Sequence, residues 1–533
     1  MVLVIERRIY YFILAILSAL FLNLFLSISF TPEKWFRLSS DLLLFLPFLL
    51  ITSSLSKKPN FWIHLFCFLI CLFGLYRCLS LVSELIFHRP FSFFDIFLIS
   101  ELDYFIDQSL SAYEKSLFIL VTLSTAILSY LVIFSISKWI VKSFRLSKKI
   151  TLAGIFLGFF MIVFIQFLVI KEGDNFSVTR GLYLKDFVVF FDEALEGIKI
   201  KNNKDLVKKN LELSNSFLNK DAYDLSKISN TNVVIIFVES YGAVLVQNSD
   251  LFESYQSFYT EMNTKLEKKF FSMVTGYSAA PESSWLSRLS FSSGTKMDHR
   301  YIANLAMVSN LTTLNKKFSL EGHKTFSFMP GVTEHVEYIE SFFDFEKRIR
   351  FWHLDWPADI NPVGWAVIPD QFALEWLGRK SSFENLTPFY TEIVLSSSHT
   401  PFGEVPPYIP KGNFNLEDYP FIKKRNSLGI LSHMESSPKK YMISIEYSLN
   451  SVCDFIEKYL SPEDLIIVIG DHQPPVLKTN SNLVPVHIIS GKKSLLDPFE
   501  KIGFHNNLSQ LKLKKHINHE DIAEFLLENY SSY

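Results

Sequence analysis

The first 170 residues of the chain consist of long apolar stretches separated by short polar segments. Five stretches approach the roughly 20 apolar residues that a helix needs to cross a bilayer, and they cover residues 9–30, 39–55, 61–82, 117–137 and 150–170. A cleaved signal peptide explains only the first stretch, so the other four require a polytopic anchor. The pattern predicts a membrane α-helical half with five transmembrane helices over residues 1–170.

Basic residues between the stretches predict the orientation of this anchor. The segment from Pro90 to Tyr113 is apolar but contains four acidic residues, and we interpret it as an interfacial or re-entrant segment instead of a sixth span. With a cytoplasmic N-terminus, nine basic residues then lie inside and four outside, as the positive-inside rule requires. Five crossings place everything after about residue 171 outside the cytoplasm.

The character of the chain changes twice after the anchor. Residues 171–231 are rich in Lys, Asn and Ser with helical periodicity in places, and we expect a connector that lies along the membrane and then leads away from it. From residue 232 onward, short apolar runs rich in β-formers alternate with polar, helix-like segments. Such runs are typical of strands buried on both faces of a sheet, so residues 232–533 are predicted to form an α/β domain. The predicted strands are Asn232–Val238, Phe270–Thr275, Lys324–Met329, Phe389–Ser396, Leu465–Gly470 and Val484–Ser490.

Composition and charge exclude several classes of protein. Hydrophobic residues make up 49% of the chain and charged residues 20%, which excludes a disordered chain and a purely cytosolic globule. The net charge of -2 provides no overall field that would attract nucleic acid. Cys453 is the only cysteine in the polar part, which therefore has no internal disulfide and no Cys-rich zinc site.

Three of the predicted strands end in groups that could bind a metal ion. Glu239 follows the strand at Asn232–Val238, the pair Asp471-His472 follows Leu465–Gly470, and His399 follows Phe389–Ser396. In open α/β sheets, ligands bind beyond the carboxyl ends of the strands. A divalent cation would compensate several such buried groups at once. Each residue alone is also compatible with a surface or helix-capping role.

The segment Tyr277–Lys296 contains two candidate nucleophiles. Ser283 and Ser284 follow a Pro-Glu dipeptide and precede a helix-like pattern of apolar residues, which places them at a helix N-terminus. Free N–H groups and the helix dipole favour a phosphate or a developing oxyanion there. The same position also suits a plain N-cap serine, and the motif taken alone favours this capping role.

The order of these motifs resembles a known superfamily. Val238-Glu239-Ser240, then SSWLSR from Ser283, then SSSHTPF from Ser396, then IGDHQPP from Ile469 resemble the alkaline phosphatase and sulfatase superfamily, and within it the lipoteichoic acid synthase-like branch. The resemblance implies five N-terminal spans followed by an extracytoplasmic sulfatase-like α/β domain. It also implies a multi-pass protein of the bacterial inner (cytoplasmic) membrane.

The resemblance assigns roles to individual residues. It implies that Glu239, Ser283, Asp471 and His472 hold one divalent metal ion and that Ser283 is the nucleophile, with Ser284 as the alternative register. It implies that His399 contacts the substrate headgroup. The synthase branch favours Mn²⁺, and Zn²⁺ or Mg²⁺ would suit the same donors.

The implied function is a phosphoglycerol-type transfer from a membrane phospholipid to a glycan or glycolipid through a covalent phosphoserine. Alternatives on the same scaffold are a sulfatase or phosphodiesterase-type hydrolase and a phosphoethanolamine transferase, and a non-catalytic glycan-binding domain is a third class. Two departures from the family patterns bear on this choice. Glu282 stands directly before the serine pair where the synthases have a Gly-x context, and Leu286 stands where sulfatases have Pro or Ala. The second departure argues against conversion of Ser284 to formylglycine.

Overall fold

The computed structural model divides the chain into two compact units, Met1–Lys199 and Ile200–Tyr533. The structure describes residues 38–39, 45–46, 48–50, 52–53, 56–86, 91–98, 112–145, 179–180, 183–332, 337–356, 368–380, 388–400, 402, 405–410, 437–474, 481–511 and 513–532.

The described part of the first unit is mostly helical. Helix α3 (Pro59–Ile86) contains the predicted span at residues 61–82, and α5 (Ala112–Arg145) contains the one at residues 117–137. Within the described residues, one helix, at Pro59–Leu81, meets the length and hydropathy expected of a membrane span. The predicted spans at 9–30 and 150–170 lie outside the described residues and most of 39–55 does too, so the five-span anchor stays a prediction.

The segment predicted to be interfacial contains a short 3-10 helix, η2 (Phe93–Leu98). Its start is bound to α7 (Tyr183–Asn202), because the Glu193 carboxylate accepts hydrogen bonds from Ser92 Oγ at 2.6 Å and from the Phe93 N–H at 2.7 Å. The connector predicted over residues 171–231 contains all of α7 and of α8 (Lys204–Asn215). A two-stranded parallel pair, β1 (Leu38–Ser39) and β2 (Thr179–Arg180), completes the described elements of this unit.

The second unit is built on an eight-stranded sheet, which confirms the predicted α/β architecture. The strand order is β10-β4-β9-β8-β3-β7-β5-β6, and every neighbouring pair is parallel except the two that involve β9. Two of these strands were not predicted: β6 (Lys347–Arg350) and β10 (Ile517–Asn518), which lie at the two edges. The predicted strands correspond to β3 (Val233–Val238), β4 (Ser272–Ala279), β5 (Lys324–Met329), β7 (Phe389–Val394), β8 (Leu465–Gly470) and β9 (Leu483–Ser490).

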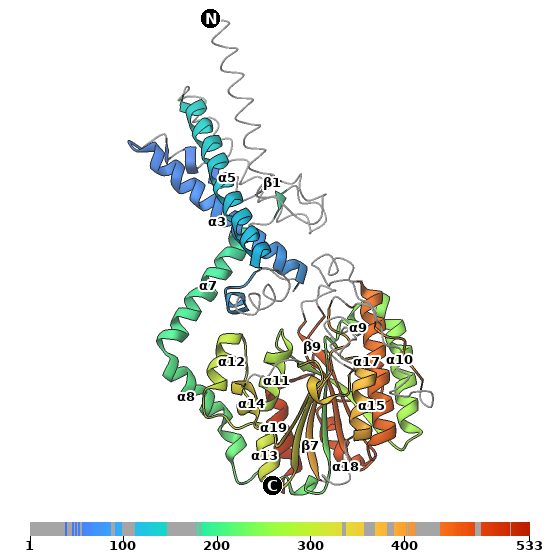
Figure 1. Cartoon of the computed structure of the whole chain (residues 1–533). Helices are drawn as coiled ribbons and strands as arrows, with labels where there is room; N and C mark the ends of the chain where they lie inside the picture. Colours follow the sequence, from blue (N-terminus) through green and yellow to red (C-terminus); the bar gives the residue numbers. More distant parts are fainter. Residues whose placement is uncertain are drawn as a thin grey trace, which may run out of the picture. The chain divides into compact units, whose positions relative to one another are not determined.

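The central strands are apolar throughout because helices cover both faces of the sheet. In β3, Val234, Ile236 and Val238 belong to one buried cluster, while Val233, Ile235 and Phe237 belong to another. This alternation is the period of two expected of a strand. Figure 1 shows the helices on the two sides of the sheet.

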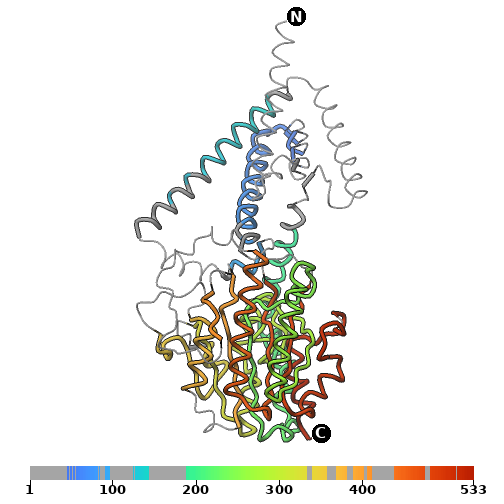
Figure 2. Tube along the Cα trace, turned by 90° about the vertical axis from the view of Figure 1, so that its right-hand side faces the viewer, coloured from blue at the N-terminus to red at the C-terminus, as the bar shows by residue number. Residues whose placement is uncertain are grey.

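The two helical layers contain different parts of the chain. One layer is formed chiefly by α10 (Ser249–Glu267), α15 (Asp370–Lys380) and α17 (Pro438–Tyr459), with the short α9 (Val244–Gln247) beside them. The other contains α11 (Ser284–Ser293), α12 (Arg300–Met307), α13 (Leu314–Leu320), α14 (Glu337–Phe343), α18 (Lys493–Lys501) and α19 (His519–Tyr530). The C-terminal residues lie against a segment in the first part of the unit, because the Leu225 N–H donates to Ser531 Oγ at 3.2 Å. Figure 2 marks the C-terminus in this unit.

Candidate metal centre

The centre of the sheet brings three of the predicted motifs together. β3 pairs in parallel with β8 on one side and with β7 on the other, so the loops after these strands leave the same edge of the sheet. The loop after β3 carries Glu239, the loop after β8 carries Asp471 and His472, and the loop after β7 carries His399. This edge is where ligands of open α/β sheets bind.

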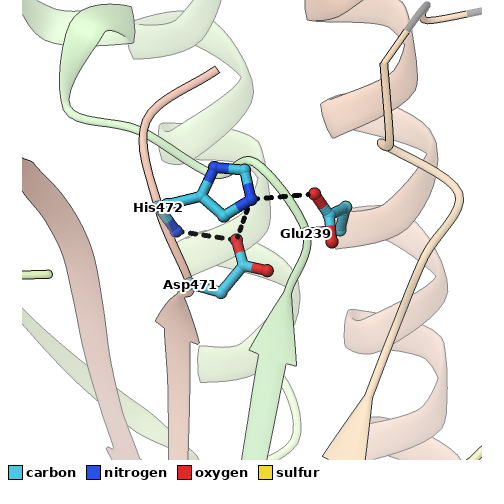
Figure 3. A group of neighbouring side chains, drawn as sticks. All are labelled: Glu239, Asp471 and His472. Atoms are coloured by element: carbon cyan, nitrogen blue, oxygen red, sulfur yellow. Dashed lines mark hydrogen bonds and ion pairs between the residues drawn. The ribbon is translucent and has the colours of Figure 1, made fainter. Parts of the chain in front are cut away.

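Glu239, Asp471 and His472 form a compact cluster (Figure 3). One potential ligand atom from each residue lies within 4.8 Å of the others. His472 Nε2 lies 3.2 Å from Glu239 Oε1 and 3.9 Å from Asp471 Oδ1. His472 Nδ1 lies 2.8 Å from the Gln473 carbonyl, which can only accept, so Nδ1 carries the hydrogen. In the neutral ring, Nε2 is then the atom with a lone pair directed toward the carboxylates.

The electrostatics of the cluster favour a bound cation. Glu239 and Asp471 are only 5% and 2% exposed, so two carboxylates share a buried space. Burial raises the pKa of Asp471, and the charge of Glu239 raises it further. Burial opposes ionisation of Glu239 as well, but the charges of His399 and His472 hold its pKa well below the usual range. A divalent cation would neutralise this repulsion more completely than one imidazolium does.

Asp471 also has an oxygen available for a ligand. Its Oδ1 accepts hydrogen bonds from the backbone N–H groups of Ser240 and His472, each at 2.7 Å. Its Oδ2 is buried and has no hydrogen-bond partner among the described residues. An unpaired buried carboxylate oxygen is costly unless an ion satisfies it. Two carboxylates and one imidazole within this distance therefore fit a divalent metal ion.

Of the two adjacent serines, Ser284 contacts this cluster. Helix α11 begins at Ser284, and Ser284 Oγ donates a hydrogen bond to Glu239 Oε2 at 3.0 Å. Ser283 is the extended N-cap residue, with φ -144° and ψ 151°, and its side chain makes no capping hydrogen bond in the described part of the chain. The choice of Ser283 as nucleophile and metal ligand stays a prediction, and the hydrogen bond to Glu239 favours the alternative, Ser284.

His399 lies beside the cluster. It is half-buried, and its charge contributes to the low pKa of Glu239. Its Nδ1 contacts the Thr400 carbonyl at 2.6 Å. The preceding residue, Ser398, donates from Oγ to the backbone carbonyl of Glu239 at 2.5 Å, which joins the two loops.

The sequence did not reveal the role of Ser240. Its N–H holds Asp471 at 2.7 Å, and its Oγ donates to Glu239 Oε1 at 2.8 Å, so one residue orients both carboxylates. Its φ of 54° lies in the left-handed region, which a non-glycine residue adopts only when its surroundings hold it there. The only signal in the sequence is a polar residue directly after a strand that ends in Glu.

Comparison with known proteins finds likeness at the level of structure. No family model matches the chain, and no curated protein sequence matches it. It is similar to the lipoteichoic acid synthase LtaP from Listeria monocytogenes, with 15% identity and a TM-score of 0.38 over 59% of this chain and 76% of that chain. It is similar to the Streptococcus pyogenes phosphoglycerol transferase GacH, with 14% identity and a TM-score of 0.37 over 61% of this chain and 82% of that one.

A third similar structure is an alkaline phosphatase superfamily protein from Vibrio parahaemolyticus, with 16% identity and a TM-score of 0.35 over 57% of this chain and 66% of that one. The TM-scores lie below 0.5 and the identities below 25%, so the chemistry has to be argued from the residues of this site.

Proposed function

We propose that the protein is a metal-dependent, membrane-anchored transferase that moves a phospholipid headgroup to a glycan or glycolipid through a covalent phosphoserine. The observation that carries the proposal is the position of Ser284. Its hydroxyl lies 3.0 Å from Glu239 Oε2, at the start of α11 and against the cluster of Glu239, Asp471 and His472. A serine hydroxyl that is hydrogen-bonded to a carboxylate of a metal site is typical of nucleophilic catalysis.

The residues of the site have different proposed roles. A divalent ion held by Glu239, Asp471 and His472 would supply positive charge that lowers the pKa of a nearby hydroxyl and attracts a phosphate oxygen. Ser284 directs its hydroxyl hydrogen to Glu239, so this carboxylate orients the attacking oxygen. Because α11 begins at Ser284, its first N–H groups, which have no partner within the helix, would favour a phosphate bound beside this serine.

The proposed reaction has two transfers. Ser284 Oγ loses its proton to Glu239, to which it already donates, and forms a bond to the phosphorus of a lipid phosphodiester, while the bond from phosphorus to the diacylglycerol oxygen breaks. Diacylglycerol leaves with a proton, for which His399 is the proposed donor, and the headgroup stays on Ser284 as a phosphodiester. A hydroxyl of the acceptor then loses its proton to His399 and attacks the same phosphorus, the bond from phosphorus to Ser284 Oγ breaks, and Ser284 regains its proton from Glu239.

Phosphatidylglycerol is the proposed donor and Mn²⁺ the proposed metal. A membrane-anchored enzyme can use a phospholipid while its acyl chains stay in the bilayer, and the apolar helix at Pro59–Leu81 is consistent with such an anchor. Carboxylate oxygens with one imidazole suit Mn²⁺, Mg²⁺ or Zn²⁺, which are told apart by reconstituting the metal-free protein with each ion. The proposed location is the bacterial inner membrane, with the second unit outside the cytoplasm.

The test uses the full chain reconstituted with Mn²⁺ in liposomes of acyl-labelled phosphatidylglycerol, with diacylglycerol release as the measurement. We expect Ser284→Ala to lower the turnover by several powers of ten, on the order of the loss seen when a covalent nucleophile is removed. Ser283→Ala is the matched control and should retain most of the activity. A release of free glycerol phosphate would indicate a hydrolase, and release only from phosphatidylethanolamine would change the donor. No release from either lipid would contradict the proposal.

A further inference from the structure

Tyr441 of α17 contacts the backbone of the turn that follows β3. It is fully buried, and its hydroxyl donates to the Ser240 carbonyl at 3.0 Å. The same oxygen accepts a hydrogen bond from the Gly242 N–H at 3.2 Å. One phenol oxygen therefore satisfies two backbone groups of this turn.

The turn that Tyr441 contacts sets the geometry of the cluster. It carries Glu239, and the Ser240 N–H holds Asp471 Oδ1 at 2.7 Å. A Cβ atom on Gly242 would lie 2.0 Å from Gln473 Oε1, so the turn also packs tightly against the residue after His472. Because Ser240 is held at a φ of 54°, the turn depends on its partners to keep this conformation.

Tyr441 also packs against the loop that carries His399. Its ring meets Phe402 edge-on, with centroids 5.1 Å apart and an interplanar angle of 65°. Phe402 is fully buried and has a φ of 54°, like Ser240. The Phe402 N–H donates to the His399 carbonyl at 3.1 Å, which closes the turn at His399. One side chain thus contacts two of the loops at the candidate site, and in each loop it contacts a residue in the left-handed region.

We propose that Tyr441 is a positioning residue for the metal centre: its hydroxyl fixes the Ser240 turn so that the carboxylates of Glu239 and Asp471 converge. The inference rests on the proposed function in that it requires a metal at the cluster. Groups that orient metal ligands from behind typically change metal affinity by about 10-fold to 100-fold when they are removed. Tyr441→Phe removes only the hydroxyl oxygen and keeps the ring on Phe402, so it isolates this role.

The test is a calorimetric titration of Mn²⁺ into the purified, chelator-stripped full chain, for the wild type and two variants. Tyr530→Phe is the matched control, because Tyr530 is also buried and its hydroxyl donates to a backbone carbonyl, that of Leu495 on α18. We expect Tyr441→Phe to raise the Kd for Mn²⁺ by about 10-fold or more. We expect Tyr530→Phe to lower the metal-free unfolding temperature without changing the Kd.

The following results would overturn the inference or the metal centre. An unchanged Kd in Tyr441→Phe, or an equal rise in Tyr530→Phe, would overturn the inference. So would a Tyr441→Phe protein that does not fold, because a hydroxyl needed for the fold itself is not a positioning group. A wild type that binds no Mn²⁺ and no Zn²⁺ would contradict the metal centre, and this result is read from the wild-type titration alone.

Discussion

At the scale of single residues, the site depends on two buried carboxylates that repel each other. Glu239 and Asp471 both lie below one-tenth exposure, and the charge of Glu239 contributes to the raised pKa of Asp471. Such a pair is unfavourable in the metal-free protein and becomes favourable once a cation binds. Metal binding and folding stability should therefore be linked through these two side chains.

The substitution Asp471→Asn tests this linkage. The Asn side-chain oxygen can still accept from the Ser240 and His472 N–H groups, while the negative charge is removed. We expect the metal-free variant to be at least as stable as the wild type, because the repulsion from Glu239 is gone. At 100 times its Kd, Mn²⁺ should stabilise the wild type by about 2.7 kcal/mol and the variant hardly at all. Thermal unfolding with and without Mn²⁺ measures both, and full stabilisation of the variant would place the metal elsewhere.

Site residues could be identified from the sequence where the chain geometry allows a single arrangement, and could not where it allows two. Glu239, Asp471 and His472 could be grouped from the sequence because Glu239 and the pair Asp471-His472 each follow a buried strand, and parallel strands end at one edge. Ser283 and Ser284 could not be separated. Successive positions at a helix start point about 100° apart, so the outcome depends on the residue at which the helix begins, and two adjacent serines give no signal for that.

At the scale of elements, helix α11 is held in place by one buried carboxylate on β7. Glu392 is fully buried and accepts hydrogen bonds from Arg288 Nε at 2.7 Å, Ser292 Oγ at 2.9 Å and the Tyr390 hydroxyl at 3.0 Å. The Arg288 guanidinium also lies 3.7 Å from the centre of the Phe343 ring. Since Arg288 and Ser292 are on α11, the helix that begins with Ser284 is anchored one and two turns below the site.

Glu392→Gln should show what this anchor contributes. The change leaves the buried Arg288 guanidinium without a counter-charge, and breaking a buried pair in this way costs roughly 3–5 kcal/mol of unfolding free energy. Arg379→Gln is the control, because Arg379 is 40% exposed and its partner Glu375 keeps Lys458 as a second partner, so the loss should be about 1 kcal/mol or less. Denaturant unfolding of both variants measures the difference. Equal losses in the two variants would contradict the account of the anchor.

The buried strands of the sheet could be predicted from the sequence, and the edge strands could not. β5 and β8 match their predicted bounds, because apolar runs that end at Gly or Pro leave little choice. The edge strands were missed for a physical reason. β6 reads Lys-Arg-Ile-Arg and β10 has two residues, so neither has the continuous apolar run that two covered faces require.

At the scale of the whole molecule, the account requires the second unit to lie outside the cytoplasm. This orientation follows from five crossings and from nine basic residues inside against four outside.

Reporter fusions to the full anchor test the orientation. A fusion after Lys220, which is exposed in the second unit, should report an extracytoplasmic position, and a fusion after Lys58, between the second and third predicted spans, should report a cytoplasmic one. The result follows from the odd number of spans, since each crossing reverses the side. A cytoplasmic signal at Lys220 would mean that the segment from Pro90 to Tyr113 crosses the membrane after all.

The most direct test of the central claim is to detect the covalent intermediate on Ser284. The full chain with Mn²⁺ and phosphatidylglycerol is quenched without an acceptor, and the tryptic peptide Phe270–Arg288 is sequenced by mass spectrometry. We expect a phosphoglycerol adduct localised to Ser284 in the wild type and in Ser283→Ala, and none in Ser284→Ala. An adduct on Ser283, or diacylglycerol release while this peptide stays unmodified, would contradict the account.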